Sequence, residues 1–136
     1  MKKIEVEIYW VDKNFSCGWS YENFGAILCT NKSLDGLKSE FIDALHNQIA
    51  DMVADGEELP RWLINGEFEV EFSMAVSALL RQAESFTTMA AISRYTGINQ
   101  KLLSHYANSL KIPRSAQRER IIEGLHKIGR QALSIQ

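Results

Sequence analysis

Residues 90–106 read AAISRYTGINQKLLSHY, and this stretch decides how the second half of the chain folds. Two short helix-forming segments flank Gly97, a residue that readily adopts the left-handed backbone conformation of a tight corner. The small side chain of Ser93 lets the two helices approach each other, and Ile98 fills the space between them. The side chain of Asn99 is suited to capping the first turn of the second helix. The spacing therefore predicts a helix-turn-helix.

The second of these helices has an apolar face and a polar face. Leu102, Leu103 and Tyr106 recur at helical spacing and are expected to point inward. The outward residues are of the types that contact base edges or phosphates in DNA. The predicted DNA-contacting residues are Asn99, Gln100, Lys101, Ser104, His105 and Asn108, with Arg94, Lys111 and Arg114 as phosphate contacts. An ordinary helical hairpin without DNA affinity is the alternative interpretation.

Charge is distributed unevenly along the chain, although the net charge is only −2. Residues 1–85 hold seven Lys or Arg against fifteen Asp or Glu, a net charge of −8. Residues 86–136 hold eight against two, a net charge of +6. A compact basic unit favours contact with a polyanion such as nucleic acid, and the acidic part is expected to have a different partner.

Helical periodicity continues from residue 73 to the end of the chain. Residues 74–136 are therefore predicted to form a basic, all-helical domain. Its first helix is expected over 74–83, and its last over 115–134 with Pro113 in the first turn. The residues expected to be buried by the last helix are Ile121, Ile122, Leu125, Ile128 and Leu133.

The first 73 residues contain four short segments in which apolar and polar side chains alternate. Strands are predicted over 3–11, 15–20, 24–30 and 68–72, because a period of two buries one face of a sheet. Ser33 is a suitable cap for a helix that continues to Asp55-Gly56. The order β-β-β-α-β predicts an α+β fold, in which one helix covers an antiparallel sheet over residues 1–73.

Composition excludes several classes of protein. The chain has 136 residues, of which 46% are hydrophobic and 24% charged, which is too apolar for a disordered chain and too short for a large multidomain enzyme. No apolar run approaches the roughly 20 residues of a membrane helix. Cys17 and Cys29 are too few for a disulfide framework or a four-ligand zinc site, and we expect buried free thiols. We therefore expect a cytoplasmic protein with no membrane partner.

The sequence contains no catalytic signature. Its three histidines, at 46, 105 and 126, fall in predicted helices, and there is no glycine-rich phosphate loop. Glu67, Glu69 and Glu71 alternate along a strand and are expected to face solvent rather than to bind a metal ion. We expect no enzymatic activity, no cofactor and no bound metal.

The stretch from Ile92 to Arg114 resembles the lambda-repressor-like (XRE-type) helix-turn-helix. Ser93 occupies the position where that family usually has alanine. Ile98-Asn99 replaces the family's usual Val-Ser, and Leu103-Ser104 replaces its usual Ile-Ser. The element order, together with residues 33–37 at the start of the first helix, resembles the HicB family of antitoxins. The resemblance implies that the first domain has a degenerate ribonuclease-H-like fold and blocks a small HicA-like ribonuclease toxin. It implies that the second domain binds operator DNA and represses its own operon. A homodimer or higher homo-oligomer is expected, because helix-turn-helix proteins commonly bind paired half-sites.

Two alternatives from other functional classes remain. In the first, the chain is a stand-alone transcriptional regulator whose α+β domain senses a ligand or mediates assembly. In the second, it is a protein-interaction module with a structural helical bundle, and it has no affinity for DNA.

Overall fold

The computed structural model describes all 136 residues, which form two compact units. Unit 1 spans Met1–Met74 and unit 2 spans Ala75–Gln136, whereas the sequence predicted a boundary between Ser73 and Met74. Unit 1 carries six Lys or Arg and fourteen Asp or Glu, a net charge of −8. Unit 2 carries nine and three, a net charge of +6. The two structural units thus have opposite charge.

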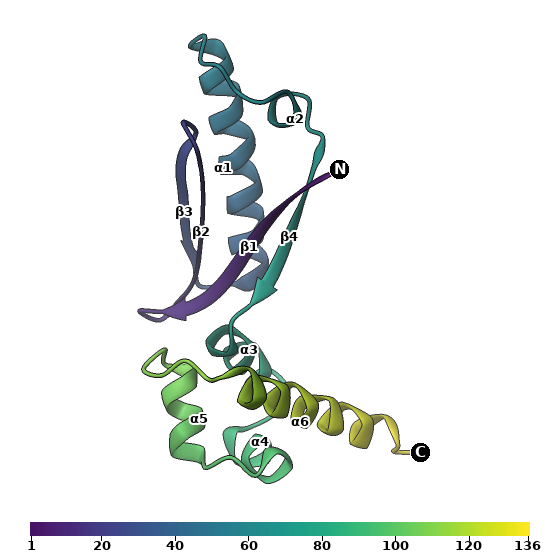
Figure 1. The fold of residues 1–136 in the computed structure, drawn as a ribbon. Helices are drawn as coiled ribbons and strands as arrows, with labels where there is room; N and C mark the ends of the chain where they lie inside the picture. The colour runs from purple at the N-terminus through teal and green to yellow at the C-terminus, as the bar shows by residue number, and fades with distance from the viewer. The chain divides into compact units, whose positions relative to one another are not determined.

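Unit 1 is built on a four-stranded sheet in the order β3-β2-β1-β4 (Figure 1). The pairs β1–β2 and β2–β3 are antiparallel, whereas β4 runs parallel to β1. The predicted α+β class is confirmed, but the prediction of an antiparallel sheet is wrong because the sheet is mixed. The strands are β1 (Lys2–Val11), β2 (Asn14–Tyr21), β3 (Gly25–Asn31) and β4 (Phe68–Met74).

The parallel pairing of β4 follows from the helix that precedes it. α1 (Leu34–Ala54) has 21 residues and carries the chain about 30 Å back along the sheet. A crossover of this length lets the next strand start at the same end as β1, so that Lys2 pairs with Phe68 and Ile8 with Met74. Apolar and polar side chains alternate in the same way in parallel and antiparallel strands. The pattern of residues 68–72 therefore could not predict the direction of β4.

α1 packs its apolar stripe against the sheet (Figure 1). Its cap is the predicted one, because the Ser33 hydroxyl accepts a hydrogen bond of 2.8 Å from the amide of Gly36. The buried residues of the helix are Leu37, Phe41, Leu45 and Ile49, and those of the strands are Ile4, Val6, Ile8, Phe15, Cys17, Ile27 and Cys29. Both cysteines are buried free thiols, as predicted.

A one-turn helix that the sequence did not predict, α2 (Arg61–Ile64), lies between α1 and β4. It follows Pro60, whose fixed φ suits the residue at a helix start. Its Leu63 is fully buried, and the Trp62 ring packs edge to face against Phe68 of β4. The predicted order with a single helix in this unit is therefore wrong, because α2 adds a second helix that closes one end of the core.

Unit 2 consists of four helices: α3 (Val76–Ala83), α4 (Met89–Thr96), α5 (Gln100–Ala107) and α6 (Ser115–Leu133). Two expectations for α6 are wrong. Leu133 is 87% exposed, and Pro113 lies outside the helix because Arg114 is its N-cap. None of the helices combines the length and the apolar character needed to span a bilayer. The buried core of the unit consists of Val76, Leu80, Ala83, Ile92, Ile98, Leu103, Tyr106, Ala107 and Ile121.

Candidate nucleic-acid interface

The candidate interface is built on α4 and α5, two eight-residue helices joined by a three-residue turn. Gly97 ends α4 in the left-handed conformation, with φ of 73°, as predicted. Its amide donates to the carbonyl of Ser93 at 2.8 Å, and the Ser93 hydroxyl donates to the carbonyl of Ile98 at 2.6 Å. The small residue at 93 therefore both permits the close approach and bonds to the turn itself.

A second set of hydrogen bonds holds the turn from inside the unit. The buried Thr96 hydroxyl donates to the carbonyl of Ile92 at 2.7 Å and accepts from the amide of Ile98 at 3.1 Å. The guanidinium of Arg120 on α6 donates to the Thr96 carbonyl at 2.8 Å. Ile98 itself is 3% exposed and plugs the space between the helices, as predicted. The backbone groups at the end of α4 are thus paired, which fixes the direction in which α5 leaves the turn.

Asn99 caps α5, as predicted. Its side-chain oxygen accepts a hydrogen bond of 2.7 Å from the amide of Lys101. The side-chain nitrogen of Asn99 is a donor that this cap does not use. The positive end of the α5 dipole and the first amides of the helix lie at the same point, and both favour an anion such as a phosphate.

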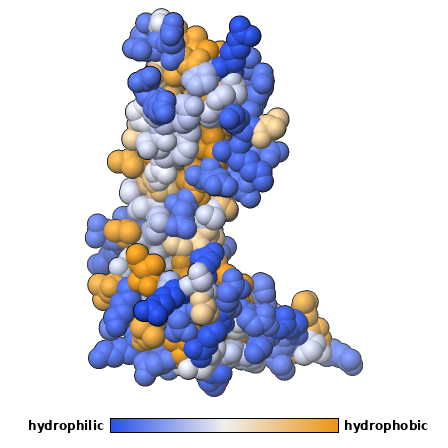
Figure 2. All heavy atoms as spheres, in the orientation of Figure 1, coloured by the Kyte–Doolittle hydropathy of each residue, from blue (hydrophilic) through white to orange (hydrophobic).

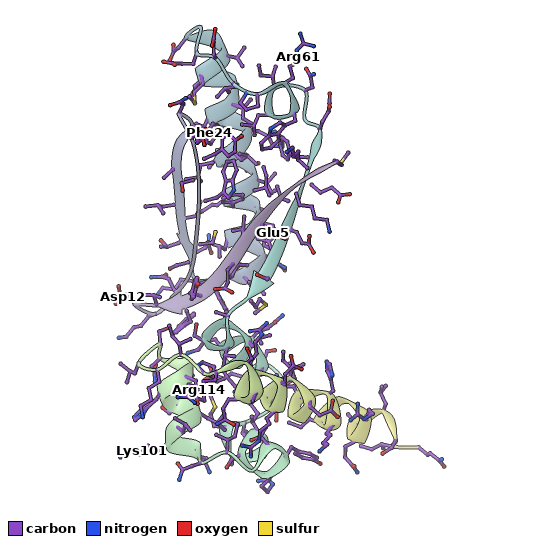
Figure 3. The ribbon with its side chains drawn as sticks, in the orientation of Figure 1. Glu5, Asp12, Phe24, Arg61, Lys101 and Arg114 are labelled. Atoms are coloured by element: carbon purple, nitrogen blue, oxygen red, sulfur yellow. The ribbon has the colours of Figure 1, made fainter.

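Three of the predicted DNA-contacting residues form one exposed group at the start of α5. Gln100, Lys101 and Ser104 are exposed and lie within the first two turns of the helix. Figure 3 shows Lys101 at the end of α5 that joins the turn. His105 is half-buried, because it lies at the edge of the buried face formed by Leu103 and Tyr106. The structure therefore brings the polar residues of the first two turns together and leaves His105 at their margin.

Asn108 lies at the far end of α5, where its side chain is already engaged. Its carboxamide oxygen accepts a hydrogen bond from Arg81 on α3, and its nitrogen donates to the carbonyl of Ser104 at 2.9 Å. Asn108 is also the C-cap of α5. Both ends of this carboxamide stabilise the end of the helix, so a base contact would have to displace one of these bonds.

The predicted phosphate contacts are distributed on either side of α5. Arg94 is exposed in the last turn of α4, and Lys111 and Arg114 are exposed in the loop between α5 and α6. The stretch from Ser85 to Arg118, which includes both helices, contains no Asp or Glu. The positive potential around α5 is therefore not offset by any acidic residue of its own segment.

Unit 1 presents a second charged surface, on the outer face of its sheet. Glu69 and Glu71 of β4 are exposed, as the strand alternation predicted. Glu71 is the register partner of Glu5 on β1, which Figure 3 labels, and Glu71 also pairs with Lys3 at 3.3 Å. Glu7 continues the row along β1 and is exposed as well. Glu69 and Glu71 lie on the edge strand β4, where charged side chains hinder pairing with another chain, and Lys3 offsets part of the repulsion between Glu5 and Glu71.

The histidines of the chain are spread over separate helices. His46, His105 and His126 lie on three different helices, and no group of three or more His, Cys, Asp or Glu is placed to hold a metal ion. Burial raises the pKa of the Cys17 thiol to about 11 and also raises that of Cys29. These thiols are therefore protonated at neutral pH.

Comparison with family models, with curated proteins and with solved structures finds no match to this chain. The geometry and charge of the two units are therefore what indicate function. Sequence reasoning missed the structural roles of Arg81 and Arg120, because their partners lie 27 and 24 residues away and local spacing carries no signal for such contacts.

Proposed function

We propose that unit 2 binds double-stranded operator DNA, with α5 as the helix that enters the major groove. The observation that carries this proposal is the fixed turn between α4 and α5, which leaves Gln100, Lys101 and Ser104 exposed in a stretch without acidic residues. Helix-turn-helix proteins contact base edges with the N-terminal residues of their second helix, the position of these three side chains.

The residues divide into two roles by their chemistry. Gln100 carries an amide that pairs with two atoms of adenine, and it is assigned to base contact. Lys101, Arg94, Lys111 and Arg114 are positive and are assigned to phosphates, together with the amides at the start of α5. Asn99, Ser104 and His105 are assigned to either base or phosphate, and Asn108 principally to holding the end of α5.

We further propose that the chain is an antitoxin and autorepressor in which unit 1 covers a small, basic, HicA-like ribonuclease toxin. The net charge of −8 and the exposed glutamates of β1 and β4 support this part of the proposal. An acidic surface accelerates association with a basic partner and suppresses association with acidic ones. In this role the chain itself has no catalytic task.

Fluorescence anisotropy tests the DNA part of the proposal. A labelled duplex from the region upstream of the gene is titrated with the full chain at physiological salt, beside a shuffled duplex of equal length. We expect tighter binding to the upstream duplex, weakened in Lys101→Ala and retained in Lys127→Ala, which removes an exposed lysine of α6 that has no assigned contact. Equal, weak binding to both duplexes would contradict the proposal and favour an interaction module.

Co-purification tests the antitoxin part. The neighbouring gene product is expressed with the chain and captured at increasing ionic strength. We expect a complex that weakens as salt rises, since screening reduces the attraction between exposed charges. Specific DNA binding without any captured partner would instead favour the stand-alone regulator.

A further inference from the structure

The two edges of the sheet in unit 1 differ in how they are protected. β4 forms one edge and carries the exposed Glu69 and Glu71, and charges of this kind hinder pairing with another strand. β3 forms the other edge, and its seven residues include no charged residue and no proline. Its register with β2 runs through all seven residues, so no bulge interrupts it. The outer side of β3, which we call the β3 edge, therefore presents an unblocked row of backbone donors and acceptors.

The outward side chains of β3 add apolar surface to this edge. Ala26, Leu28 and Thr30 alternate with the buried Ile27 and Cys29, and Leu28 in the middle is 82% exposed. Figure 2 shows hydrophobic atoms at the surface along the left margin of unit 1, where Figure 1 places β3. An added strand would cover such a side chain, because directly opposite residues of paired strands are in contact.

One side of α1 lies along β3. The Asn31 carboxamide, at the end of β3, donates to the Glu40 carboxylate at 3.0 Å. The Gln48 carboxamide donates at 2.6 Å to the carbonyl of Phe24, which precedes β3. The two bonds join the two ends of β3 to positions of α1 that are about two turns apart. The side of the helix that carries Glu40 is therefore the side next to the β3 edge.

This side of α1 is acidic. Asn47 and Asp51 share it with Glu40, because residues seven and eleven positions apart point in nearly the same direction on a helix, and all three are exposed. Lys38, the only Lys or Arg of α1, lies over the ring of Phe72 on β4, on the other side of the helix. No basic residue of α1 thus offsets the two carboxylates beside the β3 edge.

We propose that the β3 edge binds an extended segment of a basic partner protein, which adds a fifth strand to the sheet. Apolar side chains of this segment cover Leu28, and the alternate side chains are basic and face Glu40 and Asp51. The glutamates of β1 and β4 attract the same partner over a longer range. This inference rests on the proposed function, in which unit 1 covers a basic protein, and it assigns where the two chains pair.

A second copy of this chain fits the β3 edge poorly. Two copies of β3 that pair antiparallel about a two-fold axis place both α1 helices on the same face of the joined sheet. Glu40 and Asp51 of one copy then lie across the seam from the same carboxylates of the other. Like charges placed together in an interface oppose association, whereas a basic segment meets no such repulsion.

Binding of a synthetic peptide to the full chain tests the proposal. The probe is a labelled peptide of roughly ten residues, the length of a long strand, in which lysine and valine alternate. A second peptide with proline in place of valine keeps the charge but cannot pair as a strand. In anisotropy titrations, we expect the valine peptide to bind with a dissociation constant below about 1 mM, which rises with salt. The proline peptide should bind at least about tenfold more weakly.

A pair of lysine variants locates the contact. Leu28→Lys places a positive charge at the centre of the β3 edge and should raise the dissociation constant of the valine peptide at least about tenfold. The exposure of Leu28 means that the variant should fold like the wild type. Val53→Lys is the matched control, because Val53 is also an exposed apolar residue of unit 1. Val53 lies two turns after His46, which contacts Phe68 of β4, so we expect its variant to bind like the wild type.

A charge-neutralising variant and hydrogen exchange separate strand addition from charge attraction alone. Glu40→Gln combined with Asp51→Asn keeps a side-chain oxygen for the bond from Asn31, and it should weaken binding and reduce its salt dependence. The bound peptide should slow amide exchange in residues 25–31, since an added strand pairs with backbone groups of β3. Exchange in β4 should not change.

Several results would overturn the proposal. One is a valine peptide that does not bind at about 1 mM, and another is equal binding of the two peptides. Protection of β4 in place of β3 would overturn it too, as would self-association of the wild type that Leu28→Lys abolishes, because a second copy would then occupy the edge. A neighbouring gene product captured equally by the wild type and Leu28→Lys would contradict only this inference. Peptide binding at β3 without any captured neighbour would contradict only the proposed antitoxin function.

Discussion

The guanidinium of Arg120, in the second turn of α6, donates a hydrogen bond of 2.8 Å to the carbonyl oxygen of Thr96, the last residue of α4. A carbonyl at the end of a helix has no partner within the helix, and here the last helix of the unit provides one. The same guanidinium donates to Gln117 at 2.8 Å, which restricts its position. Arg120 on α6 therefore stabilises the turn between α4 and α5, and this turn sets the direction of α5.

Arg120→Ala is expected to loosen this turn. Loss of a partly exposed, charge-assisted hydrogen bond should lower the free energy of unfolding of unit 2 by about 1–2 kcal/mol, as measured by urea denaturation. DNA affinity should fall as well, because the direction of α5 is no longer fixed. Lys127→Ala, an exposed lysine on the same helix, is the control and should change neither quantity. An Arg120→Ala variant with wild-type stability and affinity would show that the turn does not depend on α6.

Gly97→Ala tests the left-handed corner itself. A residue with a Cβ atom costs about 1–2 kcal/mol in this conformation, so stability should fall by at least that amount. The Cβ would also lie 3.3 Å from the Arg120 guanidinium, which must shift to accommodate it. Gly56→Ala is a matched control, because Gly56 has nearly the same φ of 77° and its Cβ would meet nothing within 4 Å. Both variants should lose stability, but only the change at Gly97 should reduce DNA affinity. If both left DNA binding intact, the corner would not be what orients α5.

Local chemistry made much of the fold predictable, and long-range contacts account for the rest. The caps at Ser33 and Asn99 and the left-handed Gly97 depend on neighbours within four residues, and all three are present as predicted. The direction of β4 depends on where a 21-residue helix ends, which alternation alone does not encode. The exposure of Leu133 was missed because periodicity shows which residues share a face, and not whether another element covers that face.

The same reasoning applies to the candidate interface. The exposed polar residues at the start of α5 follow from helical spacing once Asn99 is known to be the cap. The hydrogen bond between Asn108 and Arg81 does not follow from helical spacing, because Arg81 lies on a different helix, 27 residues earlier in the chain. Sequence spacing thus predicts which side chains face outward, but tertiary contacts decide which of them are free to bind.

The buried thiols of unit 1 should make its stability fall at high pH. Burial raises the pKa of Cys17 to about 11 from an ordinary value of 9.0, with smaller contributions from the charges of Cys29 and Glu40. The unfolded chain therefore releases this proton at lower pH than the folded chain, and the free energy of unfolding falls as pH rises from about 9 to about 11. Chemical denaturation across this range should show the decline, and Cys17→Ala should show a shallower one. A decline of equal slope in the variant would assign the effect to other groups.

Gln100→Ala and Lys111→Ala should separate base contact from phosphate contact. Loss of the Gln100 amide should reduce discrimination between operator and unrelated DNA by about 1–3 kcal/mol and leave the salt dependence unchanged. Loss of the Lys111 charge should weaken binding to all sequences alike and reduce the slope of log K against log salt by about one, because one fewer counterion is released. Anisotropy titrations on both duplexes at several salt concentrations measure the two effects. Identical losses in the two variants would contradict this division, because Gln100 would then behave as a phosphate contact.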